Sequence, residues 1–165
     1  MRIAVIGAGS WGTTVASVVA ANAEVTLWAR RPALATALAE GANPDYLPGI
    51  DLPPLAASAD LDEVLDGAEA VLVAVPSHGL RTVLESAADL IGSDATVLSL
   101  TKGLEQGSNL RMTQVIAEVL EGHDPHRIGV LSGPNLAREI MAGEPAAPSW
   151  HSATSTRPPA SRPPS

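Results

Sequence analysis

The chain has 165 residues, which is room for one ordinary domain and not for two. Apolar residues make up 45% of it and aromatic residues only 2%, so the core must be built from aliphatic side chains, as suits a parallel sheet covered by helices. The formal charge of −8 argues against a nucleic-acid or anionic-membrane partner, and the absence of Cys excludes disulfides, thiol catalysis and thiolate zinc sites.

Short apolar runs alternate with amphipathic segments from residue 1 to about residue 143, a pattern typical of repeated βα units. It predicts strands at residues 2–6, 24–29, 70–75, 96–100 and 127–131, each followed by a helix. The sequence NPDYLPGIDLPPLAAS between residues 43 and 58 predicts a loop with at most one short strand. One or two helical turns are expected at residues 60–66.

The sequence changes character near its C-terminal end. From residue 144 onward it contains no Val, Ile, Leu or Met and is dominated by Pro, Ser, Ala and Thr. Such a segment buries too little apolar area to offset roughly 1–2 kcal/mol of backbone entropy per residue. We therefore expect a domain over residues 1–147 and a disordered, Pro-rich tail over residues 148–165. A shifted reading frame would explain the abrupt change, and a natural Pro-rich tail is the alternative.

The N-terminal residues MRIAVIG carry no basic leader, and no run approaches the ~18 apolar residues of a membrane span. A cytoplasmic protein is expected.

A glycine-rich turn follows the first predicted strand. Gly7, Gly9 and Gly12 stand in the G-x-G-x-x-G pattern between that strand and a helix, which is the context that the motif requires. Gly7 permits the tight turn, Gly9 lets a pyrophosphate approach the backbone, and Gly12 lets the helix and the strand pack closely. The helix N-terminus supplies N–H groups to the phosphates. The motif predicts dinucleotide binding by a Rossmann-like, doubly wound parallel sheet with helices on both faces; a purely structural glycine turn is the alternative.

Two arginines follow the second predicted strand. An NAD-specific site usually offers an acidic residue to the ribose 2′-hydroxyl about 20 residues after the glycines. This chain has Arg30 and Arg31 there instead, and a guanidinium can bind a 2′-phosphate through two parallel hydrogen bonds. We expect NADP or NAD as the cofactor, with NADPH preferred. Alternatively, one or both are solvated loop arginines, and this holds more for Arg31 than for Arg30.

Lys102 is the single lysine of the chain, and it directly follows the predicted strand at residues 96–100 and Thr101. Ligands of open α/β sheets bind at the carboxyl ends of the strands, where an ammonium could polarise a carbonyl or neutralise a phosphate. A surface lysine is the alternative. The other predicted strand ends carry Ser77 and His78, and Gly133 and Asn135, which either face the same crevice or serve as helix caps. No spacing of His, Asp and Glu suggests a metal site.

Taken together, the segments GAGSWGT, LWARR, NPDYLPG, AVPSH, LTKGLE and SGPNLAREI resemble the bacterial NAD(P)-dependent glycerol-3-phosphate dehydrogenases over nearly all of residues 1–147. Hydroxyisobutyrate and 6-phosphogluconate dehydrogenases are weaker fits, because they commonly have Met where Trp11 stands. The resemblance implies a soluble homodimer that interconverts dihydroxyacetone phosphate and sn-glycerol 3-phosphate for phospholipid synthesis.

The resemblance also implies roles for particular residues. Those that would contact the cofactor, besides the three glycines, are Ser10, Trp11, Arg30, Arg31, Lys102 and Ala137. Lys102 would also contact the substrate, together with Gly133 and Asn135. Many relatives have Ser in place of Asn135.

One departure from the family is large. The family has a second, all-helical domain that supplies another lysine as the acid/base group, and this chain has no lysine after Lys102. Loss of such a group alone removes about 10²–10⁴-fold of rate, so we expect the chain to bind cofactor without turnover. The alternatives are an NADP-binding sensor, a subunit completed by a partner, or another dehydrogenase class with the same fold.

Overall fold

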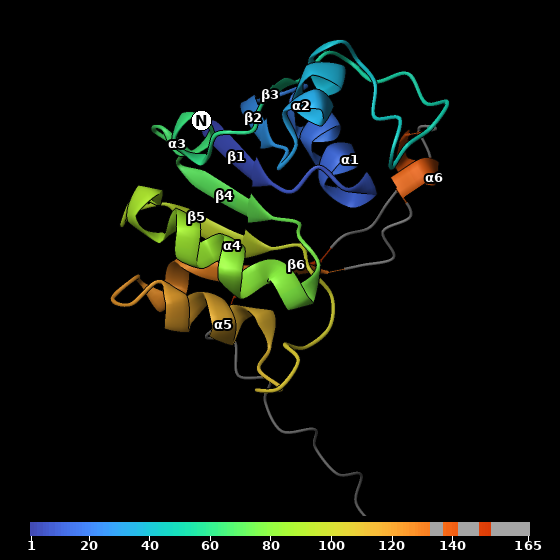
Figure 1. The fold of residues 1–165 in the computed structure, drawn as a ribbon. Helices are drawn as coiled ribbons and strands as arrows, with labels where there is room; N and C mark the ends of the chain where they lie inside the picture. Colours follow the sequence, from blue (N-terminus) through green and yellow to red (C-terminus); the bar gives the residue numbers. More distant parts are fainter. Residues whose placement is uncertain (133–136, 142–148, 153–165) are drawn as a thin grey trace, which may run out of the picture.

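Seven strands form one sheet in the computed structural model, which describes residues 1–132, 137–141 and 149–152 (Figure 1). The order in the sheet is β3-β2-β1-β4-β5-β6-β7. Strands β1 to β6 run parallel to one another, and β7 pairs antiparallel with β6. Their bounds are β1 Arg2–Ile6, β2 Glu24–Trp28, β3 Ala56–Ser58, β4 Ala70–Val73, β5 Thr96–Ser99, β6 Ile128–Ser132 and β7 Ser149–Ser152.

The central strands are apolar on both sides because helices cover both faces of the sheet. Along β1, Ala4 and Ile6 belong to one buried cluster, whereas Ile3 and Val5 belong to the other. Successive side chains of a strand point to opposite faces, so an unbroken apolar run fits a sheet that is buried twice.

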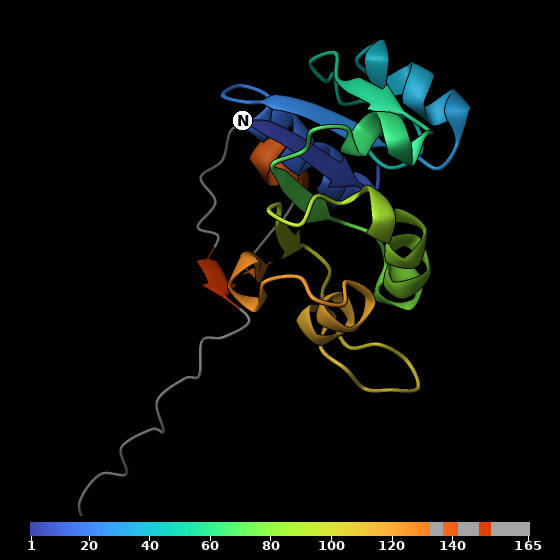
Figure 2. The same ribbon diagram turned by 90° about the vertical axis from the view of Figure 1, so that its left-hand side faces the viewer.

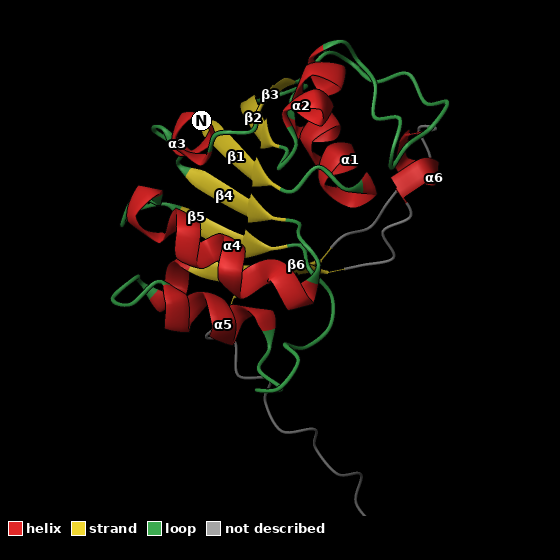
Figure 3. Ribbon diagram, viewed as in Figure 1, coloured by secondary structure: helices red, strands yellow, loops and turns green. Residues whose placement is uncertain are grey.

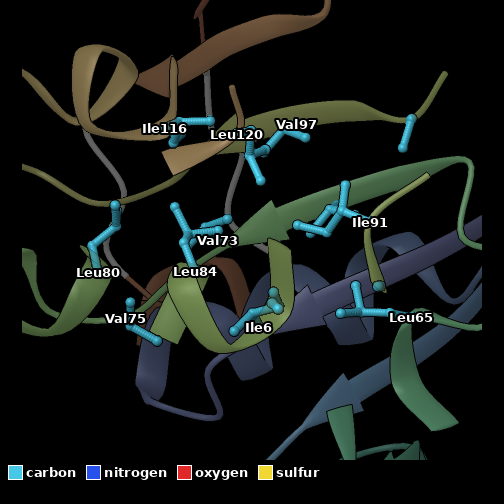
Figure 4. Close-up of a cluster of buried hydrophobic side chains, with 14 of the residues drawn as sticks. Ile6, Leu65, Val73, Val75, Leu80, Leu84, Ile91, Val97, Ile116 and Leu120 are labelled. Atoms are coloured by element: carbon cyan, nitrogen blue, oxygen red, sulfur yellow. The ribbon is translucent and has the colours of Figure 1, made fainter. Parts of the chain in front are cut away.

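Helices α3 (Leu61–Leu65), α4 (Leu80–Ala87) and α5 (Met112–Val119) contribute to one cluster, and α1 (Ser10–Val19) and α2 (Pro32–Ala39) to the other. Figure 4 shows side chains of strands and helices meeting in the first cluster. Short 3₁₀ turns lie at Ser77–Gly79, Ala88–Leu90 and Pro125–Arg127, and α6 (Ala137–Met141) contacts α1. None of the helices in the described residues is long and apolar enough to cross a membrane.

The predicted strands are confirmed, with ends that differ by at most two residues. The strand predicted at residues 70–75 ends at Val73, and the one predicted at residues 24–29 ends at Trp28. The Pro-rich stretch of residues 43–58 forms a long loop after α2 that ends in the short strand β3 (Figure 3). The helical turns expected at residues 60–66 are α3, where Asp60 accepts a hydrogen bond from the Asp62 N–H.

Strand β7 differs from the expectation of disorder for residues 148–165. Its four residues pair with β6 at the edge of the sheet (Figure 2). The high Pro content and the few apolar residues of the whole segment predict disorder. Pairing at an edge, however, needs main-chain N–H and C=O groups, and the stretch between Pro148 and Pro158 contains no Pro. Residues 153–165 lie outside the described part of the chain.

Candidate functional site

A cavity of about 310 Å³ opens where the strand order reverses, between β1 and β4. Figure 1 shows the arrowheads of β1, β4 and β5 pointing toward the same edge of the sheet. Segments from four parts of the chain line the cavity: the turn after β1, Arg30 and Arg31 after β2, Tyr46 of the long loop, and residues 74–76 after β4 with the 3₁₀ turn that follows them. Open α/β sheets bind ligands at such a reversal.

The three glycines of the turn have different steric surroundings. Gly7 has a φ of +114°, and a Cβ atom there would lie 2.8 Å from the Ala74 carbonyl oxygen. A Cβ atom on Gly12 would lie 1.9 Å from the Gly7 carbonyl oxygen. A Cβ atom on Gly9 would have no neighbour within 4 Å, although Gly9 lines the cavity. Gly7 and Gly12 therefore keep the turn tight, and Gly9 leaves room for a ligand against the main chain.

Helix α1 begins directly after this turn. Gly9 is its N-cap, so no side-chain oxygen caps the first N–H groups, and the first turn holds no acidic residue. The first N–H groups of a helix lack intrahelical acceptors and carry partial positive charge. An open main chain at Gly9 next to an uncapped helix N-terminus fits the diphosphate of a dinucleotide.

Ser10 and Trp11 occupy the first turn of α1, but neither lines the 310 Å³ cavity. Trp11 packs against the cluster on the α1 face of the sheet. Its buried Nε1 atom has no hydrogen-bond partner among the described residues. The predicted cofactor contacts of both side chains stay predictions.

Asn43, a buried polar residue of the long loop, is hydrogen-bonded to the glycine turn and to α1. Its side chain is 1% exposed, and its Nδ2 donates to the Ala8 carbonyl oxygen at 3.0 Å and to Thr13 Oγ1 at 2.8 Å. Its Oδ1 accepts from the Tyr46 N–H at 3.2 Å. Sequence reasoning missed this role, because Asn is itself a common turn residue and nothing distinguishes it within the Pro-rich segment of residues 43–58.

Arg30 and Arg31 both reach the cavity but have different neighbours. Arg31 forms an ion pair with Asp45 of the long loop. Among the described residues, no hydrogen bond or ion pair of the Arg30 side chain is found. Both side chains are exposed, so both can meet solvent or a ligand at the outer end of the cavity.

Lys102 lines a second cavity of about 290 Å³, together with Arg111 and residues of β6. The preceding residue, Thr101, joins the ends of β4 and β5, because its Oγ1 donates to the Val75 carbonyl oxygen at 2.7 Å. Gly103 follows with a φ of +99° and lies near Ser77 Oγ. The structure thus places Lys102 at a strand end, as predicted, but beside the glycine cavity and not among its lining residues.

A network of charged side chains fixes the loop that carries Lys102. Arg81 of α4 donates Nε and Nη2 to the two carboxylate oxygens of Glu105, at 2.8 and 2.9 Å, and also pairs with Glu118 of α5 at 2.8 Å. The bonds from Arg81 and Ser108 lower the pKa of Glu105 to about 2, and the two carboxylates raise the pKa of Arg81. Sequence reasoning missed this network, since its members lie 13 to 37 residues apart and follow no periodicity.

The remaining predicted site residues follow β6 in the sequence. Gly133 and Asn135 fall outside the described residues, so their predicted substrate contacts stay predictions. Ala137 begins α6, which contacts α1. Within the described part of the chain, no three His, Asp or Glu side chains gather as a metal site.

The strand order and the glycine turn at its reversal define the class of the fold: a Rossmann-like domain of the doubly wound α/β type. Within this class the chain belongs to one family. The model for the N-terminus of NAD-dependent glycerol-3-phosphate dehydrogenase matches residues 2–157. This match extends beyond residue 147, the expected end of the domain.

Individual relatives agree with this assignment. A glycerol-3-phosphate dehydrogenase [NAD(P)+] of Nocardia farcinica is 57% identical over 153 residues, which is 88% of this chain and 45% of the relative. One of Corynebacterium glutamicum is 54% identical over 150 residues, 89% of this chain and 45% of the relative. The crystal structure of the Coxiella burnetii enzyme is 38% identical with a TM-score of 0.81, over 90% of this chain and 46% of that one. The chain therefore spans a little under half the length of the relatives it matches.

Proposed function

We propose that this chain is the coenzyme-binding part of an NAD(P)-dependent glycerol-3-phosphate dehydrogenase and that it binds NADP or NAD, with NADPH preferred. The observation that carries the proposal is the open main chain at Gly9 beside the uncapped N-terminus of α1. Family membership and the names of the relatives, which specify NAD(P)+, support it.

The described residues suggest how a dinucleotide would be held. The N–H groups at the start of α1 would donate to the diphosphate, and Arg30 and Arg31 would meet a 2′-phosphate at the outer end of the cavity. The nicotinamide, when bound, supplies hydride chemistry that the amino acids lack. Lys102, at the neighbouring strand end, would offer positive charge to the phosphate or the carbonyl of a substrate.

The substrate pair that we propose is dihydroxyacetone phosphate and sn-glycerol 3-phosphate. Turnover is a property that we assign to a protein of the relatives' full length, of which this chain covers about 45%, and not to these 165 residues by themselves. We also propose a cytoplasmic location and a homodimer, for which the resemblance to the family is the support.

Gly9→Ala is the sharpest test of coenzyme binding. Its added methyl group meets open space in the fold, so the melting temperature should stay within about 1 °C of the unsubstituted chain. The same methyl group would occupy the place of the diphosphate, so the Kd for NADPH, measured by calorimetry, should rise at least about tenfold.

Gly92→Ala is the matched control, since a Cβ atom there also has no neighbour within 4 Å and Gly92 lies away from the cavity. Equal NADPH affinity of the Gly9→Ala and Gly92→Ala variants would disprove the proposed diphosphate site.

A further inference from the structure

The two arginines at the outer end of the cavity are not equivalent. Arg31 already has a carboxylate partner, Asp45, and the side chains of both are about half exposed. A 2′-phosphate approaching this end of the cavity would meet the charge of Arg30 in full. It would meet Arg31 together with the negative charge of its partner.

The position of Asp45 is set by buried anchors on both sides of it in the sequence. Asn43 is held against the glycine turn by its two hydrogen bonds to Ala8 and Thr13. Leu47 is 1% exposed, and its N–H donates to the Asn43 carbonyl oxygen at 2.9 Å. The Tyr46 N–H donates to the Asn43 side chain, which closes the turn. Asp45 therefore lies in a fixed turn next to the cavity, and little conformational entropy is lost when it pairs with Arg31.

We propose that Asp45 is a specificity-determining residue, which lowers the preference for NADPH over NADH by neutralising Arg31. The inference rests on the proposed coenzyme site. The Asp45 carboxylate pairs with Nη2 of Arg31, which is one of the atoms that a phosphate needs for two parallel hydrogen bonds. Its negative charge also repels the 2′-phosphate dianion. The uncharged 2′-hydroxyl of NADH meets no such repulsion, so Asp45 permits the use of both coenzymes.

Asp45→Asn tests the proposal, because it keeps the shape of the side chain and removes its charge. The Kd for NADPH should fall about two- to fivefold, the range typical of one exposed charge pair, while the Kd for NADH stays the same. Adenosine 2′-monophosphate and adenosine 5′-monophosphate should show the same contrast. The control is Asp51→Asn, which removes an equal charge from an exposed position of the same loop and should change neither Kd.

A double substitution shows whether the effect acts through Arg31. In an Arg31→Ala background, Asp45→Asn should no longer alter the Kd for NADPH. Three results would overturn the role of Asp45: equal changes for both coenzymes, a change that persists without Arg31, or weaker NADPH binding. If the unsubstituted chain binds neither dinucleotide, the proposed function itself fails; if it binds both and the ratio does not move, only the role of Asp45 fails.

Discussion

The two cavities at the carboxyl edge of the sheet differ in what shapes them: the main chain shapes one, and side chains hold the loop of the other. The cavity between β1 and β4 is shaped by main chain, because two glycines close the turn and a third leaves it open. The cavity of Lys102 depends on a long loop after β5, which is held by the side chains of Thr101 and Glu105.

This difference explains why the sequence predicts the cavity at the glycine turn and only part of the cavity of Lys102. A turn that approaches a neighbouring carbonyl oxygen so closely tolerates glycine alone, so its requirements appear as a motif. A loop fixed by charged side chains can be built from many combinations of residues, so its sequence carries no pattern.

Gly12→Ala should have the largest effect on stability, because it breaks the main-chain site itself. The added methyl group would lie 1.9 Å from the Gly7 carbonyl oxygen, so α1 must move away from β1. We expect the free energy of unfolding, measured in urea, to fall by about 3 kcal/mol, the upper end of typical overpacking costs. NADPH affinity should fall with it.

A rise in the free energy of unfolding of the Gly12→Ala variant would be equally informative. Ala favours a helix interior over Gly by about 1 kcal/mol, so a chain that relaxed around the methyl group would gain stability. Stabilisation of the Gly12→Ala variant would show that the glycine turn is not sterically closed. The distinction between a main-chain site and a side-chain site would then be lost.

Asn43→Ala tests how far the glycine turn depends on a side chain from elsewhere. The substitution leaves the Ala8 carbonyl oxygen and the Thr13 hydroxyl without this donor in a buried place. We expect a loss of about 1–3 kcal/mol of unfolding free energy.

Asn43→Asp sharpens this test, because it keeps an acceptor for the Tyr46 N–H and removes the Nδ2 donor. It should be at least as destabilising as Asn43→Ala at about pH 7, where the new carboxylate is charged. Full stability of the Asp variant would show that the turn does not need the donated hydrogen bonds.

The fold was predictable because each apolar run of the central strands reports burial on both faces. The strand ends were not all predictable: Val75, for example, is buried beyond the end of β4 without belonging to a strand, so burial does not mark the boundary. Within the candidate site, whose ligand contacts stay predictions, the positions of the glycines and of Lys102 after strands were predictable. Asn43 and the ion pairs of Arg31 and Arg81 were not, because contacts between distant segments arise only when the chain has folded.

The smallest expected effect concerns the loop of Lys102, and it depends on pH. The bonds from Arg81 lower the pKa of Glu105 in the folded protein from 4.5 to about 2, so the folded state favours the carboxylate more than the unfolded state does. A depressed pKa contributes stability that is present above about pH 4.5 and is lost as the pH falls toward 2. Glu105→Gln removes this contribution, so the difference in urea midpoint between the two chains should be constant above about pH 5 and shrink below it. Glu85→Gln, an exposed position on α4, corrects for the loss of one negative charge. A difference that stays constant down to about pH 2.5 would mean that Glu105 is not held by Arg81 in solution, and that the Lys102 loop lacks the anchor that distinguishes it from the glycine turn.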